Sequence, residues 1–229
     1  MNWFRRFLNF LYRGNIPLTK SLIVIMVTVF LWWYISFLFG IVFPLHILSL
    51  ERTSIPCKPW SLLTYPLLNT DPLGLIFNSL ALWLFGGSLE IIWGTGKYFR
   101  ELLIIVILTG IGLWLGMTIM PGYFPGGFYV INTALIVAWV VRNPGRVVLF
   151  SFIFPLEAKW LGIIVVFLQF FSFLYNPLMG LLSLSGSAYA YFTAGSRWRR
   201  KPSQSYYSRE AWRQSFWQRF RRKHLKRIK

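Results

Sequence analysis

The chain has 229 residues, of which 56% are hydrophobic and 13% are charged, about half the charged share of a soluble domain. A chain of 26.9 kDa has too little interior to bury this many apolar side chains away from water. The formal net charge of +18 is concentrated in residues 197–229, which hold 13 of the 24 Lys and Arg residues, so a soluble nucleic-acid-binding domain is excluded for the apolar body.

The first 17 residues predict an amphipathic helix that lies in the membrane interface. Apolar side chains recur at helical spacing, with Arg5, Arg6 and Arg13 beside them. A helix with one apolar and one basic face binds at the headgroup level of a bilayer. We therefore treat residues 1–17 as a separate interfacial segment. Its apolar stripe consists of Trp3, Phe4, Phe7, Leu8 and Leu11.

Six apolar stretches follow, and each is interpreted as a transmembrane helix because about 20 apolar residues span a bilayer. They are residues 21–43, 73–89, 102–120, 126–141, 161–175 and 178–195. The stretch 147–160 carries Glu157 and Lys159 after Pro155, so we expect it to lie at the interface instead of crossing. The predicted fold class is an all-α integral membrane protein whose six-helix transmembrane domain spans residues 18–195.

The basic residues between the stretches predict the orientation. With six spans both termini share one side, which receives 22 of the Lys and Arg residues, while the other side receives Arg52 and Lys58. Basic residues favour the cytoplasmic side, so both termini are expected there. A bacterial inner membrane is the expected location. An organelle membrane stays open as an alternative, because the N-terminal segment has arginines and no acids, as transit segments do.

The loop of residues 44–72 is placed on the outer side by this assignment. It is rich in Leu, Ile, Pro and Trp, so we expect it to lie in the outer leaflet. The chain has one cysteine, Cys57, and two histidines, His46 and His224, far apart in the sequence. These numbers predict no disulfide, no bound metal and no cofactor.

Several motifs are similar to those of one known family. Residues 59–65, PWSLLTY, resemble a tryptophan–arginine loop with Ser61 in the arginine position. Residues 77–90, FNSLALWLFGGSLE, and 93–97, WGTGK, are close to the pattern of a second helix and its cytoplasmic turn, and 155–160, PLEAKW, to the kink before a fifth helix. The family is that of the rhomboid intramembrane proteins, and the resemblance covers residues 18–195. It implies a six-helix rhomboid-like bundle.

The resemblance also shows what catalysis would need. Active rhomboids are serine proteases with a Gly-x-Ser-Gly motif at the start of helix four and a histidine in helix six, because a hydroxyl needs a base to become a nucleophile. Counted from Gly126–Gly127, Tyr129 stands at the serine position, and Ser183 stands at the histidine position. Asn78 matches the oxyanion-side asparagine, whereas Gly74 replaces the histidine one turn earlier. The resemblance therefore implies a pseudoprotease and not an enzyme.

Polar residues inside the predicted spans suggest a remnant of that site. Asn132 and Thr133 lie just beyond Tyr129 in helix four, and intramembrane polar residues are candidate functional residues. We predict a polar cavity bounded by Asn78, Tyr129, Asn132 and Ser183. Ser185–Gly186 and the Gly112-x-x-x-Gly116 pattern are interpreted as sites of close helix packing. A relocated nucleophile at Ser183 or Ser185 is the alternative.

Residues 196–229 form a basic, aromatic tail. Trp212, Phe216 and Phe220 recur every four residues, which predicts one face of a helix. An anionic membrane surface and a partner protein are the favoured targets, with RNA as a third. The predicted interaction surface consists of Trp212, Arg213, Phe216, Trp217, Phe220 and Arg221.

Together these features predict a catalytically inactive rhomboid-like protein that binds transmembrane segments. It would act as a scaffold, an assembly or quality-control factor, or a subunit of a larger membrane complex. Its expected partners are membrane lipids and the transmembrane helices of other proteins, in preference to nucleic acid. Two alternatives are an active intramembrane serine protease with an atypical nucleophile and a membrane anchor that contacts the ribosome or nucleic acid through its basic tail.

Overall fold

The computed structural model describes residues 16–41, 43–52, 57–120, 124, 126–144, 147–150 and 154–196. All of them belong to one compact unit, Met1–Trp198. The basic tail, including its predicted interaction surface, and nearly all of the amphipathic segment 1–17 lie outside the described residues. The predictions for both ends of the chain therefore stay predictions.

Within the described residues, three helical runs are long and apolar enough to cross a membrane. The first is α2 (Pro17–Leu38). The second runs without a break through α6 (Pro72–Ala81), a π-helical turn η2 (Leu82–Gly86) and α7 (Gly87–Trp93). The third is α8 (Thr95–Ile119). They correspond to the predicted stretches 21–43, 73–89 and 102–120, each shifted by a few residues at its ends.

The other predicted spans form shorter helices. They are α9 (Tyr129–Arg142), α10 (Ala158–Phe171), α11 (Pro177–Ser183) and α12 (Ser185–Ser196), so the predicted stretch 178–195 is divided at Leu184. At 1.5 Å per residue, α9 and α10 are each about 21 Å long, shorter than the roughly 30 Å hydrocarbon core of a bilayer. The helical membrane fold is thus confirmed, while the count of six crossings stays a prediction.

A two-stranded antiparallel hairpin lies within the segment that was expected at the interface. Strand β1 (Val147–Phe150) pairs with β2 (Phe154–Glu157), and Val147 lies opposite Glu157. Consecutive β-branched valines favour an extended chain, and Pro155 cannot sit inside a helix. The predicted all-α fold class did not include this hairpin, which leads directly into α10.

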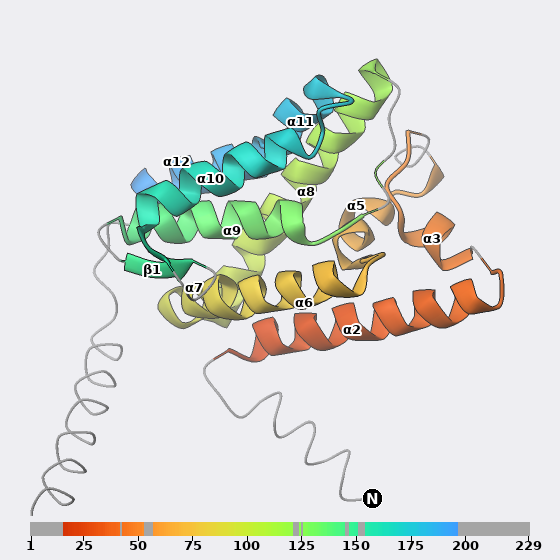
Figure 1. The fold of residues 1–229 in the computed structure, drawn as a ribbon, viewed down its shortest axis with the longest axis horizontal. Helices are drawn as coiled ribbons and strands as arrows, with labels where there is room; N and C mark the ends of the chain where they lie inside the picture. The colour runs from red at the N-terminus through yellow and green to blue at the C-terminus, as the bar shows by residue number, and fades with distance from the viewer. Residues whose placement is uncertain are drawn as a thin grey trace, which may run out of the picture. The chain divides into compact units, whose positions relative to one another are not determined.

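Helix α9 lies at the centre of the bundle. All eleven residues from Val130 to Val140 are buried. Figure 1 shows α9 between α10 on one side and α6 on the other, with α2 at the edge beyond α6, and α9 also contacts α12 and η2. A helix that is apolar on all sides is typically buried in this way. Non-helical backbone at the ends of such a helix is tolerated in a membrane where other parts of the protein surround it.

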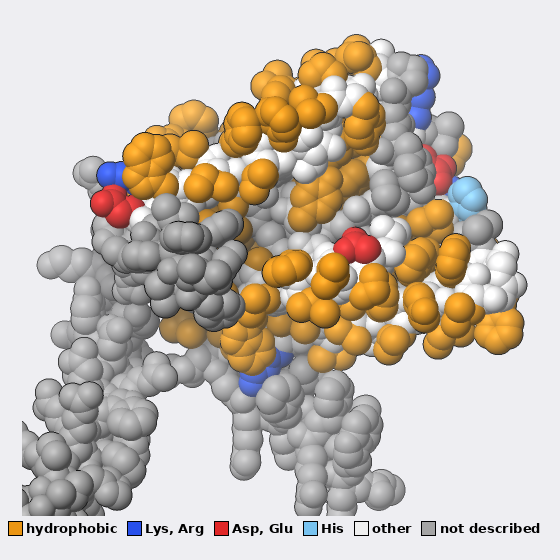
Figure 2. Space-filling view, in the orientation of Figure 1, with side chains coloured by type: hydrophobic (Ala, Val, Ile, Leu, Met, Phe, Trp, Pro, Cys, Tyr) orange, Lys and Arg blue, Asp and Glu red, His pale blue; other side chains and the backbone are white. Residues whose placement is uncertain are grey.

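The surface of the bundle is strongly hydrophobic. Figure 2 shows hydrophobic side chains over most of the described face, with charged groups in a few small patches. Phe37, Phe77 and Leu181, for example, are each at least 60% exposed. Such an exterior is suited to lipid and not to water, as expected for an integral membrane protein.

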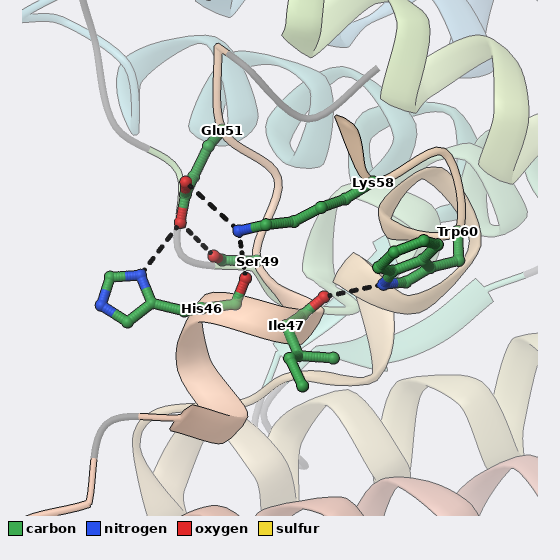
Figure 3. Close-up of polar contacts among 6 residues, drawn as sticks. All are labelled: His46, Ile47, Ser49, Glu51, Lys58 and Trp60. Carbon is green, nitrogen blue, oxygen red and sulfur yellow. Dashed lines mark hydrogen bonds and ion pairs between the residues drawn. The ribbon is translucent and has the colours of Figure 1, made fainter. Parts of the chain in front are cut away.

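The loop between α2 and α6 is folded. It contains α3 (Phe43–Leu48), α5 (Ser61–Thr64) and a 3₁₀ turn η1 (Tyr65–Leu67). Figure 3 shows its polar cluster. The Glu51 carboxylate accepts a hydrogen bond from Ser49 (3.0 Å) and lies 3.4 Å from His46 Nδ1 and 3.8 Å from Lys58 Nζ. Trp60 Nε1 donates to the Ile47 carbonyl at 3.3 Å. These contacts close the loop on itself.

Candidate functional site

The candidate site lies where the chain enters α9. Gly126 and Gly127 have φ angles of +142° and +133°, which L side chains rarely adopt. The Gly127 N–H donates to the Tyr65 carbonyl at 3.1 Å, and a Cβ on Gly126 would come within 2.6 Å of the same oxygen. Both glycines are therefore needed to bring this loop against η1 and to start α9 at Tyr129.

Tyr129 packs against other aromatic rings. Its ring centroid is 6.0 Å from that of Phe124, in an edge-on arrangement, and 6.4 Å from that of Phe173, with the planes 25° apart. Aromatic pairs in such arrangements contribute more to stability than the burial of their surface area alone. The residue that we expect at the serine position thus has a packing role in this structure.

Three asparagines form a chain of amide hydrogen bonds beside Tyr129. Asn78 Nδ2 donates to Asn69 Oδ1 at 2.8 Å, and Asn132 Nδ2 donates to both the backbone carbonyl (3.0 Å) and the Oδ1 (3.2 Å) of Asn78. All three side chains are buried. This chain of amides links the loop after η1 to α6 and α9 inside the bundle, where an unpaired amide would be costly.

A pocket with a volume of about 440 Å³ opens between these elements. Asn69 and Asn78 contribute its amides, and Asp71 contributes a carboxylate. Half of the remaining lining residues are aromatic, namely Phe77, Phe124, Tyr129, Phe173 and Tyr175. Of the four residues predicted to bound a cavity, Asn78 and Tyr129 line this pocket. Asn132 does not line it but holds Asn78 in place.

Ser183, the fourth predicted residue, belongs to another polar cluster. It is fully buried, its hydroxyl donates to the Gly180 carbonyl at 2.7 Å, and Gln169 Nε2 donates to its Oγ at 3.0 Å and to its carbonyl at 3.1 Å. It does not line the pocket. The structure therefore gathers three of the predicted residues and places Ser183 with Gln169 of α10.

Ser185 and the glycines of α8 have the packing role that was predicted for them. Ser185 Oγ donates to the Leu108 carbonyl of α8 at 2.8 Å. A Cβ on Gly112 would lie 2.1 Å from the Leu182 carbonyl oxygen, and one on Gly116 would lie 2.6 Å from the Cα of Met179. The Gly112-x-x-x-Gly116 pattern thus lets the backbones of α8 and α11 touch.

Sequence reasoning missed several polar residues of the bundle. Asp71 was signalled by the Asp71–Pro72 pair, since Asp at a helix N-cap followed by Pro is a common helix start. Gln169 and Asn69 carried no local signal, because their partners lie far away or in another element. Glu101 is also buried, and it accepts a hydrogen bond from Tyr189 of α12 at 2.8 Å.

No described histidine lies near Tyr129, Ser183 or Ser185. His46 belongs to α3 in the loop outside the bundle, and 62% of its side chain is exposed. His224 lies outside the described residues. Within the part of the chain that the structure describes, no group of three or more His, Cys, Asp or Glu side chains is placed to hold a metal ion.

Comparisons with known proteins agree with a membrane protein of rhomboid type. A family model described as "Eukaryotic integral membrane protein (DUF1751)" matches residues 21–195. The rhomboid protease GlpG of Photorhabdus laumondii subsp. laumondii is 29% identical over 149 residues, which make up 64% of this chain and 49% of that protein. The chain thus spans about half the length of this curated relative. The family description, being eukaryotic, gives no support to the expected bacterial inner membrane.

Proposed function

Because the chain belongs to the family of eukaryotic integral membrane proteins DUF1751 and is rhomboid-like, we propose that it is an inactive member of this fold that binds transmembrane segments without cutting them. In this role it serves as a scaffold, an assembly or quality-control factor, or a subunit of a membrane complex. The eukaryotic description favours an organelle membrane, the alternative that the sequence left open. The excess of basic residues on one side favours cytoplasmic termini.

The proposal is supported by the surroundings of Tyr129 and Ser183, the residues that we expect at the two positions of the Ser–His dyad in active rhomboids. Tyr129 is packed between Phe124 and Phe173, and the hydroxyl of Ser183 is buried against Gly180 and Gln169. A serine nucleophile needs a base within hydrogen-bond reach, and the described residues offer none to Ser183 or Ser185. This supports binding in place of proteolysis.

A second cavity supports a role in binding apolar segments. It has a volume of about 750 Å³ and lies between α9, α10 and α12. Val137, Ile163, Val166 and Phe167 are among its apolar lining residues, and Lys159 is the only charged residue among the described ones that line it. The Phe167 side chain is 56% exposed. An apolar groove on the side of a membrane bundle can receive the side chains of another helix.

The test combines a probe for serine nucleophiles with crosslinking in native membranes. A fluorophosphonate probe should label neither Ser183 nor Ser185. A photoreactive amino acid at Phe167 should crosslink to intact transmembrane segments, mapped by mass spectrometry. The same amino acid at Ile25 of α2, which is 43% exposed and does not line the groove, is the matched control.

The outcomes separate the alternatives. Labelling of either serine would favour an active protease with an atypical nucleophile. Crosslinks to lipid alone from both positions would contradict the binding role. Steep salt-dependent binding of the full chain to RNA, lost when the basic tail is removed, would favour the ribosome or nucleic-acid anchor.

A further inference from the structure

The charge in the lining of the pocket beside Tyr129 is negative. Among the described residues that line it, Asp71 is the only charged one. The Asp71 side chain accepts a hydrogen bond from the Gly74 N–H as the N-cap of α6. None of the ion pairs found among the described residues involves Asp71. A carboxylate without a counter-charge beside a pocket favours a cationic ligand.

The same pocket is rich in aromatic rings. Phe77 and Tyr175 are 66% and 64% exposed, and Tyr129 lies deeper, against the buried ring of Phe173. In Figure 2, an acidic group lies among hydrophobic and uncharged side chains in the middle of the described face, and the blue basic groups lie at its margins. Aromatic faces attract cations, by about 0.5–1 kcal/mol at exposed sites and about 2 kcal/mol where water is excluded.

The chemistry of the lining discriminates among cations. Ca²⁺ takes six to eight oxygen ligands and is usually bound by several carboxylates, whereas the described lining of this pocket has one carboxylate, and its other side-chain oxygens belong to amides and hydroxyls. A weakly hydrated organic ammonium needs fewer oxygens and gains from aromatic contacts. The volume of about 440 Å³ lies within the range of small-molecule sites.

We propose that this pocket binds a quaternary ammonium group, as carried by choline and by the headgroups of choline phospholipids. Asp71 provides the counter-charge, and Phe77, Tyr129 and Tyr175 provide the aromatic surface. The pocket lies at the predicted outer end of the bundle, and exposed aromatic residues mark the headgroup level of a membrane. This binding does not depend on the proposed role in holding transmembrane segments, and it is measured separately.

The test uses the full chain in nanodiscs made of equal parts phosphatidylcholine and phosphatidylglycerol. After extraction into mild detergent, native mass spectrometry counts the lipids that stay bound. Asp71→Asn removes the charge and keeps the helix cap, since Asn caps as well as Asp. Tyr175→Leu removes an exposed ring. Glu157→Gln and Tyr34→Leu are matched controls outside the pocket, with exposed side chains on β2 and α2.

The wild-type chain should retain phosphatidylcholine in preference to phosphatidylglycerol, and tetramethylammonium chloride should displace it where sodium chloride does not. Asp71→Asn and Tyr175→Leu should each lower this retention about tenfold, which corresponds to about 1.4 kcal/mol, and the controls should not. Displacement by choline at millimolar concentration would identify the free cation as sufficient. Displacement by choline only at the higher concentrations at which tetramethylammonium acts would identify the lipid as the source. Both results support the site.

Other results would overturn the proposal. Equal retention of the two lipids would do so, as would unchanged retention in Tyr175→Leu and Asp71→Asn. If Asp71→Asn fails to fold, the retention of phosphatidylcholine by Tyr175→Leu alone tests the proposal. A crosslink from a photoreactive amino acid at position 77 to another protein's transmembrane segment, with no choline effect, would show a different occupant.

Discussion

The carboxylate of Glu90 in α7 accepts hydrogen bonds from both the backbone N–H (2.8 Å) and the hydroxyl (2.7 Å) of Thr19 in α2. It also accepts from the Leu18 N–H at 2.9 Å and the Thr95 hydroxyl at 3.0 Å. The N-cap residue of α2, Ile16, makes no side-chain cap. A residue more than 70 positions away thus satisfies the first N–H groups of this helix, which also favour a negative charge.

Replacing Glu90 should destabilise the bundle. Glu90→Ala leaves several buried donors without a partner, and we expect a loss on the order of 3 kcal/mol in unfolding free energy. Glu90→Gln keeps one acceptor oxygen and should lose about half as much. Thermal unfolding in detergent measures both, with exposed Glu157→Gln as a control. Equal stability of Glu90→Ala and the wild type would contradict this capping role.

The glycines of α8 differ sharply in what surrounds them. Gly112→Ala and Gly116→Ala place a Cβ against the backbone of α11, which cannot move aside like a flexible side chain, so we expect each to lower stability by about 2 kcal/mol or more. Gly96→Ala, in the same helix with nothing within 4 Å, should raise stability by roughly 0.5 kcal/mol. Thermal unfolding without guanidinium measures the stability of the three variants. The same change in stability in all three variants would show that helix propensity, and not the contact with α11, determines the effect of these substitutions.

The pair Asn78–Asn132 should show measurable coupling. We expect a double-mutant cycle with Asn78→Ala and Asn132→Ala to give about 0.6–1.7 kcal/mol, the range for side-chain hydrogen bonds between membrane helices. Unfolding in mixed micelles supplies the free energies. The exposed pair Tyr34 and Phe77 lies on separate helices and provides a cycle that should give no coupling. Additive losses for the asparagines would indicate that their bond contributes nothing.

Restoring the family's dyad should not restore proteolysis. In the double variant Tyr129→Ser with Ser183→His, an imidazole ring replaces the small side chain of Ser183, which is fully buried against Gly180 and Gln169. Overpacking of this kind costs about 1–3 kcal/mol and shifts neighbouring groups. Fluorophosphonate labelling and cleavage of a rhomboid reporter substrate measure the outcome. Labelling at position 129 would show that only the two side chains separate this protein from an active protease.

The single cysteine of the chain provides a test of orientation. Cys57 is exposed in the loop predicted on the outer side, so a membrane-impermeant maleimide should label it from that side in sealed vesicles. In a Cys57→Ser background, Gly96→Cys in the predicted cytoplasmic turn should react only after permeabilisation. The reversed pattern would invert the predicted orientation.

Local patterns predicted the features that depend on local chemistry. The apolar stretches located the helices, because hydrophobic length and charge are read along the chain. The Gly112-x-x-x-Gly116 pattern also identified a contact with another helix, since two small residues one turn apart leave the backbone open. The predicted stretches 126–141 and 161–175 form the helices α9 and α10, but α10 ends at Phe171. A turn follows to Asn176, which caps α11 through the Met179 N–H.

The parts that were missed depend on distant partners. Nothing near Ser183 indicates that Gln169 will bind it, and nothing near Asn78 selects Asn69 over another amide. The aromatic pocket required the Gly126–Gly127 loop, the start of α6 and the end of α10 to meet. Gly127 and the end of α10 at Phe171 are 44 residues apart, and the start of α6 at Pro72 is 54 residues before Gly126, so only the packed structure shows that Asp71 and Tyr175 line one space.

The contrast between α2 and α9 has a consequence for how membrane thickness acts on the protein. α2 buries only Thr19, Met26 and Phe30, and it is fixed at its first turn by Glu90. A long helix held at one end adapts to a thinner or thicker bilayer by tilting, at a cost of fractions of a kcal/mol per ångström. α9 is enclosed by protein and is shielded from such changes. Lipid composition should therefore change the angle of α2 while the pocket at the start of α9 keeps its shape.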